Sequence, residues 1–120
     1  MPLKVLVLAT GLLWPVSVSS QQARFFATGN DLFRFCSAGG ATSESLCNGY
    51  VAGVVDTVGV FEAIFGVTKI TCVEKNVSNE QVKQIVMQYL TAHPETRHLG
   101  AAGLVFAALQ PAFPCKEPVH

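Results

Sequence analysis

Four cysteines constrain this chain more than any other feature of its sequence: Cys36, Cys47, Cys72 and Cys115. All four lie in the part of the chain that would remain after removal of an N-terminal export signal, described below. That part has about 100 residues, which is near the lower size at which one hydrophobic core suffices. An even number of cysteines in an exported chain of this size is typical of disulfide bonds. The alternative is a zinc site, but no two cysteines have C-x-x-C spacing and no histidine is suitably interleaved. We therefore expect two disulfides and no metal.

Residues 1–20 are typical of a secretory signal peptide. Lys4 supplies the positive charge, an apolar run covers 5–18, and small residues precede the expected cut. The alternative is an uncleaved anchor, but the run is shorter than the roughly 20 residues that a membrane span needs, and Pro15 interrupts it. Cleavage predicts a mature domain over 21–120 that is periplasmic or secreted, with no membrane segment.

Charge and motifs exclude several functions. The chain has eight lysines and arginines and eight acidic residues, for a net charge of zero with neutral histidines. This balance argues against a nucleic-acid partner, which needs a basic surface. No nucleophile elbow and no helical pair of metal-binding histidines occurs. We therefore expect no catalytic residues, no cofactor and no enzyme.

Four apolar segments separated by glycine, proline and small polar residues predict an all-α fold, a bundle of four main helices. The first begins near Thr28 or Asn30, either of which can cap it, and stops at a glycine pair. The second covers about 42–65, and Gly66 suits a left-handed cap. Because this second segment is apolar on nearly all sides, it is either central to the fold or membrane-spanning, and its polar residues favour the central position.

The third and fourth helices have clear boundaries in the sequence. Ser78 and Gln81 form a capping box at the start of the third, and Pro94 ends it after His93. The fourth covers about 95–112 or 99–112.

The helical layout favours one of the three possible disulfide pairings. Cys36 ends the first helix and Cys47 lies in the first turns of the second, so a tight turn brings them together. Cys72 precedes the third helix and Cys115 follows the fourth, so antiparallel packing brings these ends together. The other two pairings would have to reach across the bundle. We therefore favour Cys36–Cys47 with Cys72–Cys115.

Two features of the second segment have competing interpretations. Gly49 and Gly53 lie four residues apart, which suits either a dimer face or an intramolecular crossing with small residues of the fourth helix. We favour the crossing. Asp56 lies in an apolar stretch and should find a donor, with Arg97 or His98 ahead of Lys69. A general base is the functional alternative, but no nucleophile or metal set accompanies it.

The connection over 66–77 is long for a link between helices, and long loops are often functional. A partner-binding contact here would use apolar and basic side chains: Val67, Thr68, Lys69 and Ile70. The alternative is a loop that is merely tethered by Cys72.

The sequence resembles the Rap/Tai immunity proteins, the immunity family of type VI secretion amidases, over most of the mature chain. Residues 46–56 fit the segment C-x-G-Y-x-x-G-x-x-D, and a second group of matches follows. The structural signature among the shared positions outside the cysteines comprises Gly49, Tyr50, Gly53, Asp56, Tyr89, His93, Pro94, Arg97 and His98. One departure is Glu74, where many members carry a proline, and this leaves the shape of the loop open.

The resemblance implies a periplasmic, helical, disulfide-bonded protein that is often a homodimer. Its known relatives neutralise peptidoglycan amidase effectors delivered by type VI secretion, and they plug the active-site groove with a protruding loop. A periplasmic holdase-like chaperone and an orphan structural module of the same fold are the competing interpretations, because the shared residues specify a fold and not a partner.

Overall fold

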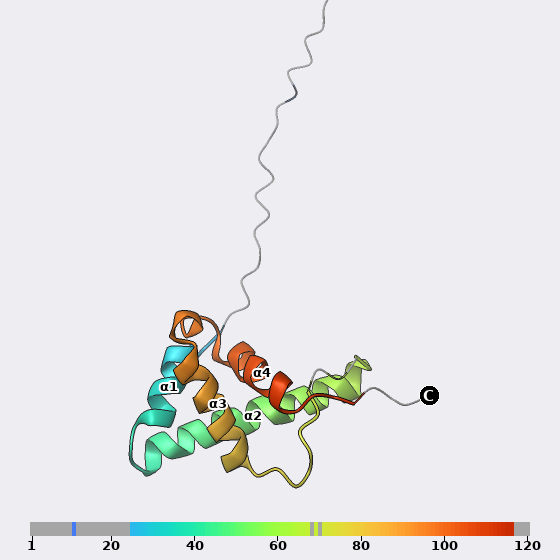
Figure 1. The fold of residues 1–120 in the computed structure, drawn as a ribbon. Helices are drawn as coiled ribbons and strands as arrows, with labels where there is room; N and C mark the ends of the chain where they lie inside the picture. Colours follow the sequence, from blue (N-terminus) through green and yellow to red (C-terminus); the bar gives the residue numbers. More distant parts are fainter. Residues whose placement is uncertain (1–10, 12–24, 68, 70, 117–120) are drawn as a thin grey trace, which may run out of the picture.

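A computed structural model describes residues 11, 25–67, 69 and 71–116. The expected signal peptide lies outside these residues, apart from Gly11. The described part contains α1 (Gly29–Ser37), α2 (Ala41–Phe65), α3 (Asn79–Ala92), the short 3-10 helix η1 (Pro94–Thr96) and α4 (Ala101–Ala112) (Figure 1). No strand occurs within those ranges. The expected all-α bundle of four main helices is confirmed.

Capping boxes start two of the helices. At α1 the Asp31 backbone N–H donates to the Thr28 hydroxyl over 3.3 Å, and the Thr28 N–H donates back to the Asp31 carboxylate over 2.9 Å. At α3 the Gln81 N–H donates to the Ser78 hydroxyl, and the Ser78 N–H donates to the Gln81 side chain. The second box was expected from the sequence, and at α1 the structure selects Thr28 over Asn30 as the cap.

The end of α2 is as expected, but the start of α4 is not. Gly66 adopts a left-handed conformation (φ 60°) and its N–H donates to the carbonyl of Glu62. α4 begins at Ala101, later than either expected start, because residues 94–96 form a separate 3-10 turn. The Ala101 N–H donates instead to the carbonyl of Ala27, over 2.9 Å, and so ties α4 to the segment before α1.

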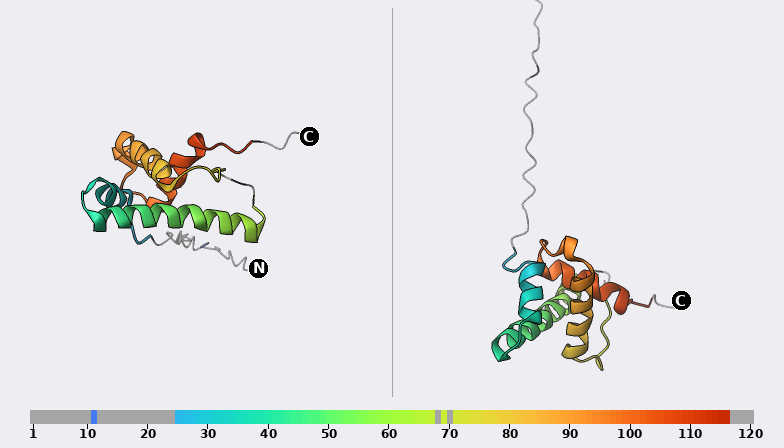
Figure 2. Two further views of the ribbon diagram at one scale, coloured as in Figure 1. Left: turned by 90° about the horizontal axis from the view of Figure 1, so that it is seen from below. Right: turned by 60° about the vertical axis from the view of Figure 1, so that its left-hand side comes forward.

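The core lies where α1, α3 and α4 pack on the first half of α2 (Figures 1 and 2). Each of the four α-helices contributes at least one fully buried side chain. The largest of these are Leu32, Cys47, Val51, Val86, Leu90, Val105 and Leu109. Closely packed apolar side chains of this kind provide most of the stability of a small helical domain.

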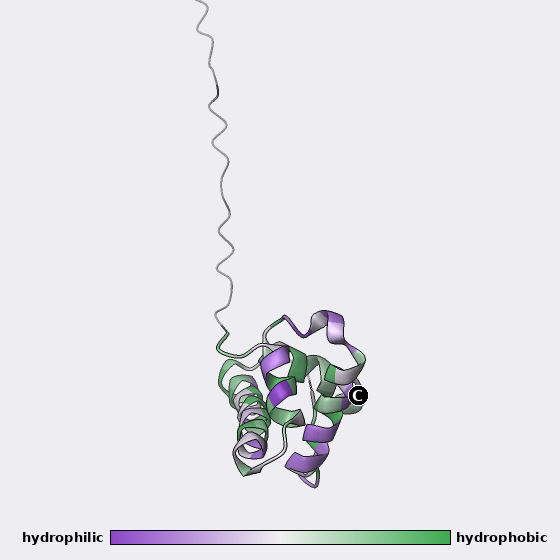
Figure 3. Cartoon of the chain, turned by 90° about the vertical axis from the view of Figure 1, so that its left-hand side faces the viewer, coloured by the Kyte–Doolittle hydropathy of each residue, from purple (hydrophilic) through white to green (hydrophobic). Residues whose placement is uncertain are grey.

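The expectation that α2 lies centrally is only partly correct. The helix is apolar around much of its circumference and carries only three charged side chains (Figure 3). Within it only Cys47 and Val51 are buried, whereas Leu46, Phe61 and Ile64 are at least half exposed. The neighbouring helices are too short to cover all 25 residues of α2. Among the described residues, no helix is long and apolar enough to cross a membrane.

Both favoured disulfides are present. Cys36 bonds to Cys47 at the turn between α1 and α2, and Cys72 bonds to Cys115 beyond the end of α4. Next to the second bond, the Cys72 N–H donates to the carbonyl of Phe113 over 3.0 Å. The buried Thr71 hydroxyl lies 3.4 Å from that same carbonyl oxygen. The long connection between α2 and α3 is therefore fixed to the C-terminal end of α4 at one point.

A close approach at the start of α1 was not expected from the sequence. The Gly29 N–H donates to the carbonyl of Leu99 over 2.8 Å, and the Asn30 N–H donates to the carbonyl of Arg97 over 2.7 Å. A Cβ atom at Gly29 would collide with the Leu104 side chain and would lie 2.8 Å from the Arg97 carbonyl oxygen. Only glycine therefore fits where α1 meets the turn before α4.

Candidate functional site

The second half of α2 carries more exposed large apolar side chains than any other helix of the described fold. We call residues 56–67 the α2 arm, because this segment continues past the point where α1 and α3 cover the helix (Figures 1 and 2). The exposed fractions are 56% for Val60, 53% for Phe61, 68% for Ile64 and 63% for Phe65. The rings of Phe61 and Phe65 lie 4.5 Å apart. A contiguous apolar patch on this scale is typical of a binding surface.

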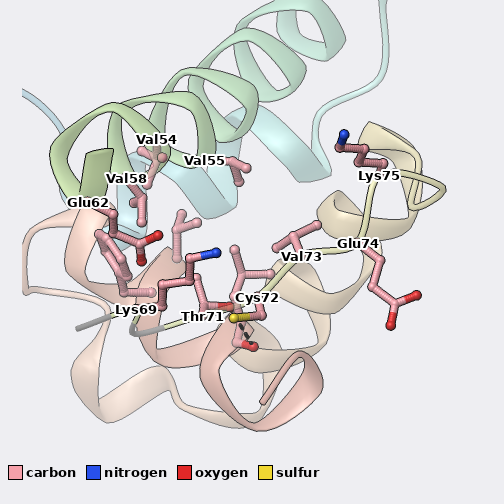
Figure 4. A pocket seen from close by; sticks show the side chains of 14 residues that line it. Val54, Val55, Val58, Glu62, Lys69, Thr71, Cys72, Val73, Glu74 and Lys75 are labelled. Carbon is pink, nitrogen blue, oxygen red and sulfur yellow. Dashed lines mark hydrogen bonds between the residues drawn. The ribbon is translucent and has the colours of Figure 1, made fainter. Parts of the chain in front are cut away.

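A hollow lies between the α2 arm and the segment that follows it. Its volume is about 440 Å³, with apolar side chains of α2 on one wall and of α4 on another. Figure 4 shows the Glu62 carboxylate and the Lys69 ammonium turned toward the middle of this hollow. The site therefore combines an apolar wall with one acidic and one basic group.

A second, more apolar groove of about 650 Å³ separates the α2 arm from α4. Its lining includes Gly49, Tyr50, Gly53, Phe61 and Phe106. Partial burial raises the pKa of the Tyr50 hydroxyl, so this side chain stays uncharged over a wide pH range. The groove is suited to an apolar side chain and not to a charged one.

The expected partner-binding loop lies beside this arm. Val67 is 40% exposed and Lys69 is exposed. Thr68 and Ile70 lie outside the described residues. Val67 lines the groove beside α4 together with Phe61, and Lys69 lines the hollow together with Glu62. The role of both residues in binding stays a prediction.

Comparison with known proteins identifies the family. The family model of the Rap1a immunity proteins matches residues 28–115, which include all four helices and both disulfides. The chain belongs to the Rap1a immunity protein family. No curated protein and no solved structure matches the chain. Membership supports an immunity role, and therefore the binding of a protein effector.

The glycines of the Rap1a-like segment do not form the expected intramolecular crossing. Gly49 and Gly53 are exposed, and a Cβ atom at either would have no neighbour within 4 Å. The same holds for Gly103 on α4. The crossing interpretation is therefore wrong: α4 leaves a groove beside these glycines and does not press against them.

The expected partners of Asp56 are also wrong. Asp56 points outward from α2, is exposed and makes no ion pair with another described residue. Arg97 lies at the other end of the fold, where its guanidinium carbon is 4.0 Å from the centre of the Phe33 ring. His98 is exposed. Sequence spacing alone did not reveal that the apolar stretch around Asp56 has a solvent-facing side.

The remaining Rap1a-like positions close the turn after α3. The His93 N–H donates to the carbonyl of Tyr89, and the two rings lie 4.4 Å apart. The His93 Nδ1 atom lies 3.0 Å from a Glu95 carboxylate oxygen. A hydrogen bond from its own backbone N–H, and then the one from His93, lowers the pKa of Glu95. These residues build the turn that leads to α4.

Proposed function

We propose that this protein is a periplasmic immunity protein that binds and inhibits a peptidoglycan amidase effector delivered by type VI secretion. Family membership supports the immunity role, and the resemblance seen in the sequence suggests the amidase. Two disulfides suit an oxidising compartment, and the apparent signal peptide supports export to it. Inhibition of this kind needs binding only, so no catalytic group of this chain takes part.

The observation that carries this proposal is the exposed apolar α2 arm and the loop that follows it, both held on a disulfide-bonded body. Val67, which is 40% exposed, lies two residues after the exposed Phe65, and the Lys69 ammonium is turned toward the hollow beside the arm (Figure 4). An apolar tip with one basic group can enter a groove in an enzyme and exclude its substrate. Large apolar side chains surrounded by polar ones are the usual energetic centre of such contacts.

The experiment titrates the exported chain against a candidate amidase and measures peptidoglycan hydrolysis. A stoichiometric inhibitor abolishes hydrolysis at a one-to-one ratio. Lys69→Asp should weaken binding, whereas Lys75→Asp is the matched control because its ammonium points away from the hollow (Figure 4). Equal affinity of the two variants would remove the loop from the binding site.

The exposed apolar arm also supports a second candidate, a holdase-like chaperone. A chaperone suppresses the aggregation of several unrelated client proteins at acid pH. An immunity protein protects against one effector at a fixed ratio. Light scattering of two unrelated clients at acid pH separates these functions.

We also expect the protein to be a homodimer. The resemblance implies this state, and the open surface at Gly49 and Gly53 allows another chain to approach the α2 backbone closely.

A further inference from the structure

The hollow between the α2 arm and the segment that follows it has the form of a small-molecule site. Its apolar lining from α2 and α4 consists of Val54, Val55, Val58, Val105, Phe106 and Leu109. Small-molecule sites are usually concave, mostly apolar and about 300–1,000 Å³ in volume, with a few polar groups that orient the ligand. The hollow, with a volume of about 440 Å³, lies within this range.

The hollow is formed before any ligand binds. Thr71 and Cys72 line it, and both are tied to the end of α4. Cys72 is bonded to Cys115, and its N–H donates to the Phe113 carbonyl over 3.0 Å. The buried Thr71 hydroxyl lies 3.4 Å from the carbonyl oxygens of Leu109 and Phe113. A site held in this way loses little conformational freedom when it is occupied, which favours binding.

Two opposite charges face this hollow. Figure 4 shows the Lys69 ammonium and the Glu62 carboxylate turned toward its middle, whereas the charged groups of Glu74 and Lys75, which also line it, point away. Among the described residues, none forms an ion pair with the Lys69 ammonium. The Glu62 carboxylate has several lone pairs, so it can accept a hydrogen bond from a ligand in addition to any other that it accepts.

We propose that the hollow binds a short apolar peptide as a zwitterion, with the terminal carboxylate of the peptide at Lys69 and its terminal ammonium at Glu62. The apolar side chains of the peptide lie against the valines of α2 and against Phe106. The proposal goes beyond the immunity function and does not depend on it, because no amidase takes part in its test.

The charges of the hollow favour a zwitterion over other small apolar molecules. A purely apolar ligand would leave the Lys69 ammonium facing an apolar surface, which is unfavourable for a charged group. An apolar anion would bring a negative charge close to the Glu62 carboxylate, and an apolar cation would bring a positive charge close to Lys69. A ligand with one charge of each sign avoids both penalties.

The volume of the hollow favours a peptide of two residues. At roughly 30 Å³ for each water-sized group, the hollow holds on the order of 15 such groups. This is more than one apolar amino acid fills, and it is close to the size of an apolar dipeptide such as leucyl-leucine.

Isothermal titration calorimetry of the exported, disulfide-bonded chain with leucyl-leucine tests the site. The dipeptide should bind at a one-to-one ratio. Diglycine has the same charges but no apolar side chains, so it should bind at least about ten-fold more weakly. Leucine alone should also bind more weakly than the dipeptide, because it fills less of the hollow. Absence of saturable binding at millimolar leucyl-leucine, or equal affinity for diglycine, would overturn the proposal.

Four variants of the chain locate the bound peptide. Lys69→Met and Glu62→Gln should each weaken leucyl-leucine binding by about ten-fold or more, because each removes one charged contact. The matched controls are Lys75→Met and Glu74→Gln, which make the same changes in side chains that point away from the hollow (Figure 4). Both controls should bind like the wild-type chain. Equal affinities in the test and control variants, with unchanged circular dichroism spectra, would overturn the site.

Blocked peptides test the two charged contacts without any change in the chain. N-acetyl-leucyl-leucine lacks the ammonium and leucyl-leucinamide lacks the carboxylate, so each should bind the wild-type chain at least about ten-fold more weakly than the free dipeptide. Lys69→Met should lower the affinity for the free dipeptide and leave the affinity for the amide unchanged. If Lys69→Met weakened the binding of both peptides equally, the proposed contact between Lys69 and the terminal carboxylate would be wrong.

Discussion

The two halves of α2 have similar compositions but opposite surroundings. In the first half Cys47 and Val51 are fully buried among α1, α3 and α4, whereas no residue of the α2 arm is fully buried. Both halves are rich in valine and small residues. An apolar residue of this helix can therefore be either buried or exposed, and its hydrophobicity alone does not predict which. What differs is the length of helix that the neighbours cover, and the excess of apolar residues marks where a partner can bind.

The largest expected effect compares a buried leucine of the body with an exposed isoleucine of the arm. Leu90→Ala leaves a cavity in the core and should lower the free energy of unfolding by about 2–5 kcal/mol. Ile64 is 68% exposed, so Ile64→Ala should change it by no more than about 0.5 kcal/mol. Urea unfolding at a concentration where the chain is monomeric measures both. Similar losses for the two variants would mean that the arm belongs to the cooperative core.

Two glycines also compare a tightly packed position of the body with an open position on α2. Gly29→Ala places a methyl group against Leu104 and the Arg97 carbonyl, and should cost about 1–3 kcal/mol of stability. Gly53→Ala fills open space on a helix and should stabilise the monomer by up to about 1 kcal/mol. Opposite signs are the expected result in thermal unfolding. Destabilisation by Gly53→Ala would show that something lies closer to this part of α2 than the structure indicates.

A smaller effect concerns the cap of α1. Hydrogen bonds from Thr28, first from its backbone N–H and then from its hydroxyl, lower the pKa of Asp31 from its ordinary value of 3.8. Because the folded pKa lies below the unfolded one, this contribution to stability is complete above the unfolded value and is lost as pH falls through the folded value. Thr28→Ala removes the hydroxyl but keeps the backbone N–H, so it should raise the Asp31 pKa part of the way toward 3.8, and loss of the cap should cost about 1 kcal/mol at neutral pH. Carbon-detected NMR titration measures the pKa of Asp31, and urea unfolding measures the free energy of unfolding. An unchanged pKa would contradict the capping box.

The sequence was sufficient for the features that depend on local chemistry. Ser78 with Gln81, the left-handed Gly66 and the pairing of Cys36 with Cys47 all follow from residues close together in the chain. The pairing of Cys72 with Cys115 also followed, because it requires only that α3 and α4 return to a common end.

Features that depend on which distant surfaces meet could not be predicted in this way. The sequence gives no local sign that Gly29 must fit against Leu104, or that Arg97 packs on Phe33. An apolar residue in the α2 arm has the same helical spacing whether it faces the core or the solvent. For this reason the sequence predicts a wholly central α2 although its second half is exposed, and a crossing with α4 where the glycines face open space.

The smallest expected effect on stability is at Asp56. It tests directly whether this residue of the α2 arm is exposed or is paired in the interior of the fold. If Asp56 were paired in the interior, removing its charge would destabilise the chain by several kcal/mol. Because it is exposed and has no ion-pair partner among the described residues, Asp56→Asn should change the unfolding free energy of the monomer by no more than about 0.5 kcal/mol. Urea unfolding of the monomer measures this change. A loss of several kcal/mol would show instead that the Asp56 carboxylate has a partner in the interior.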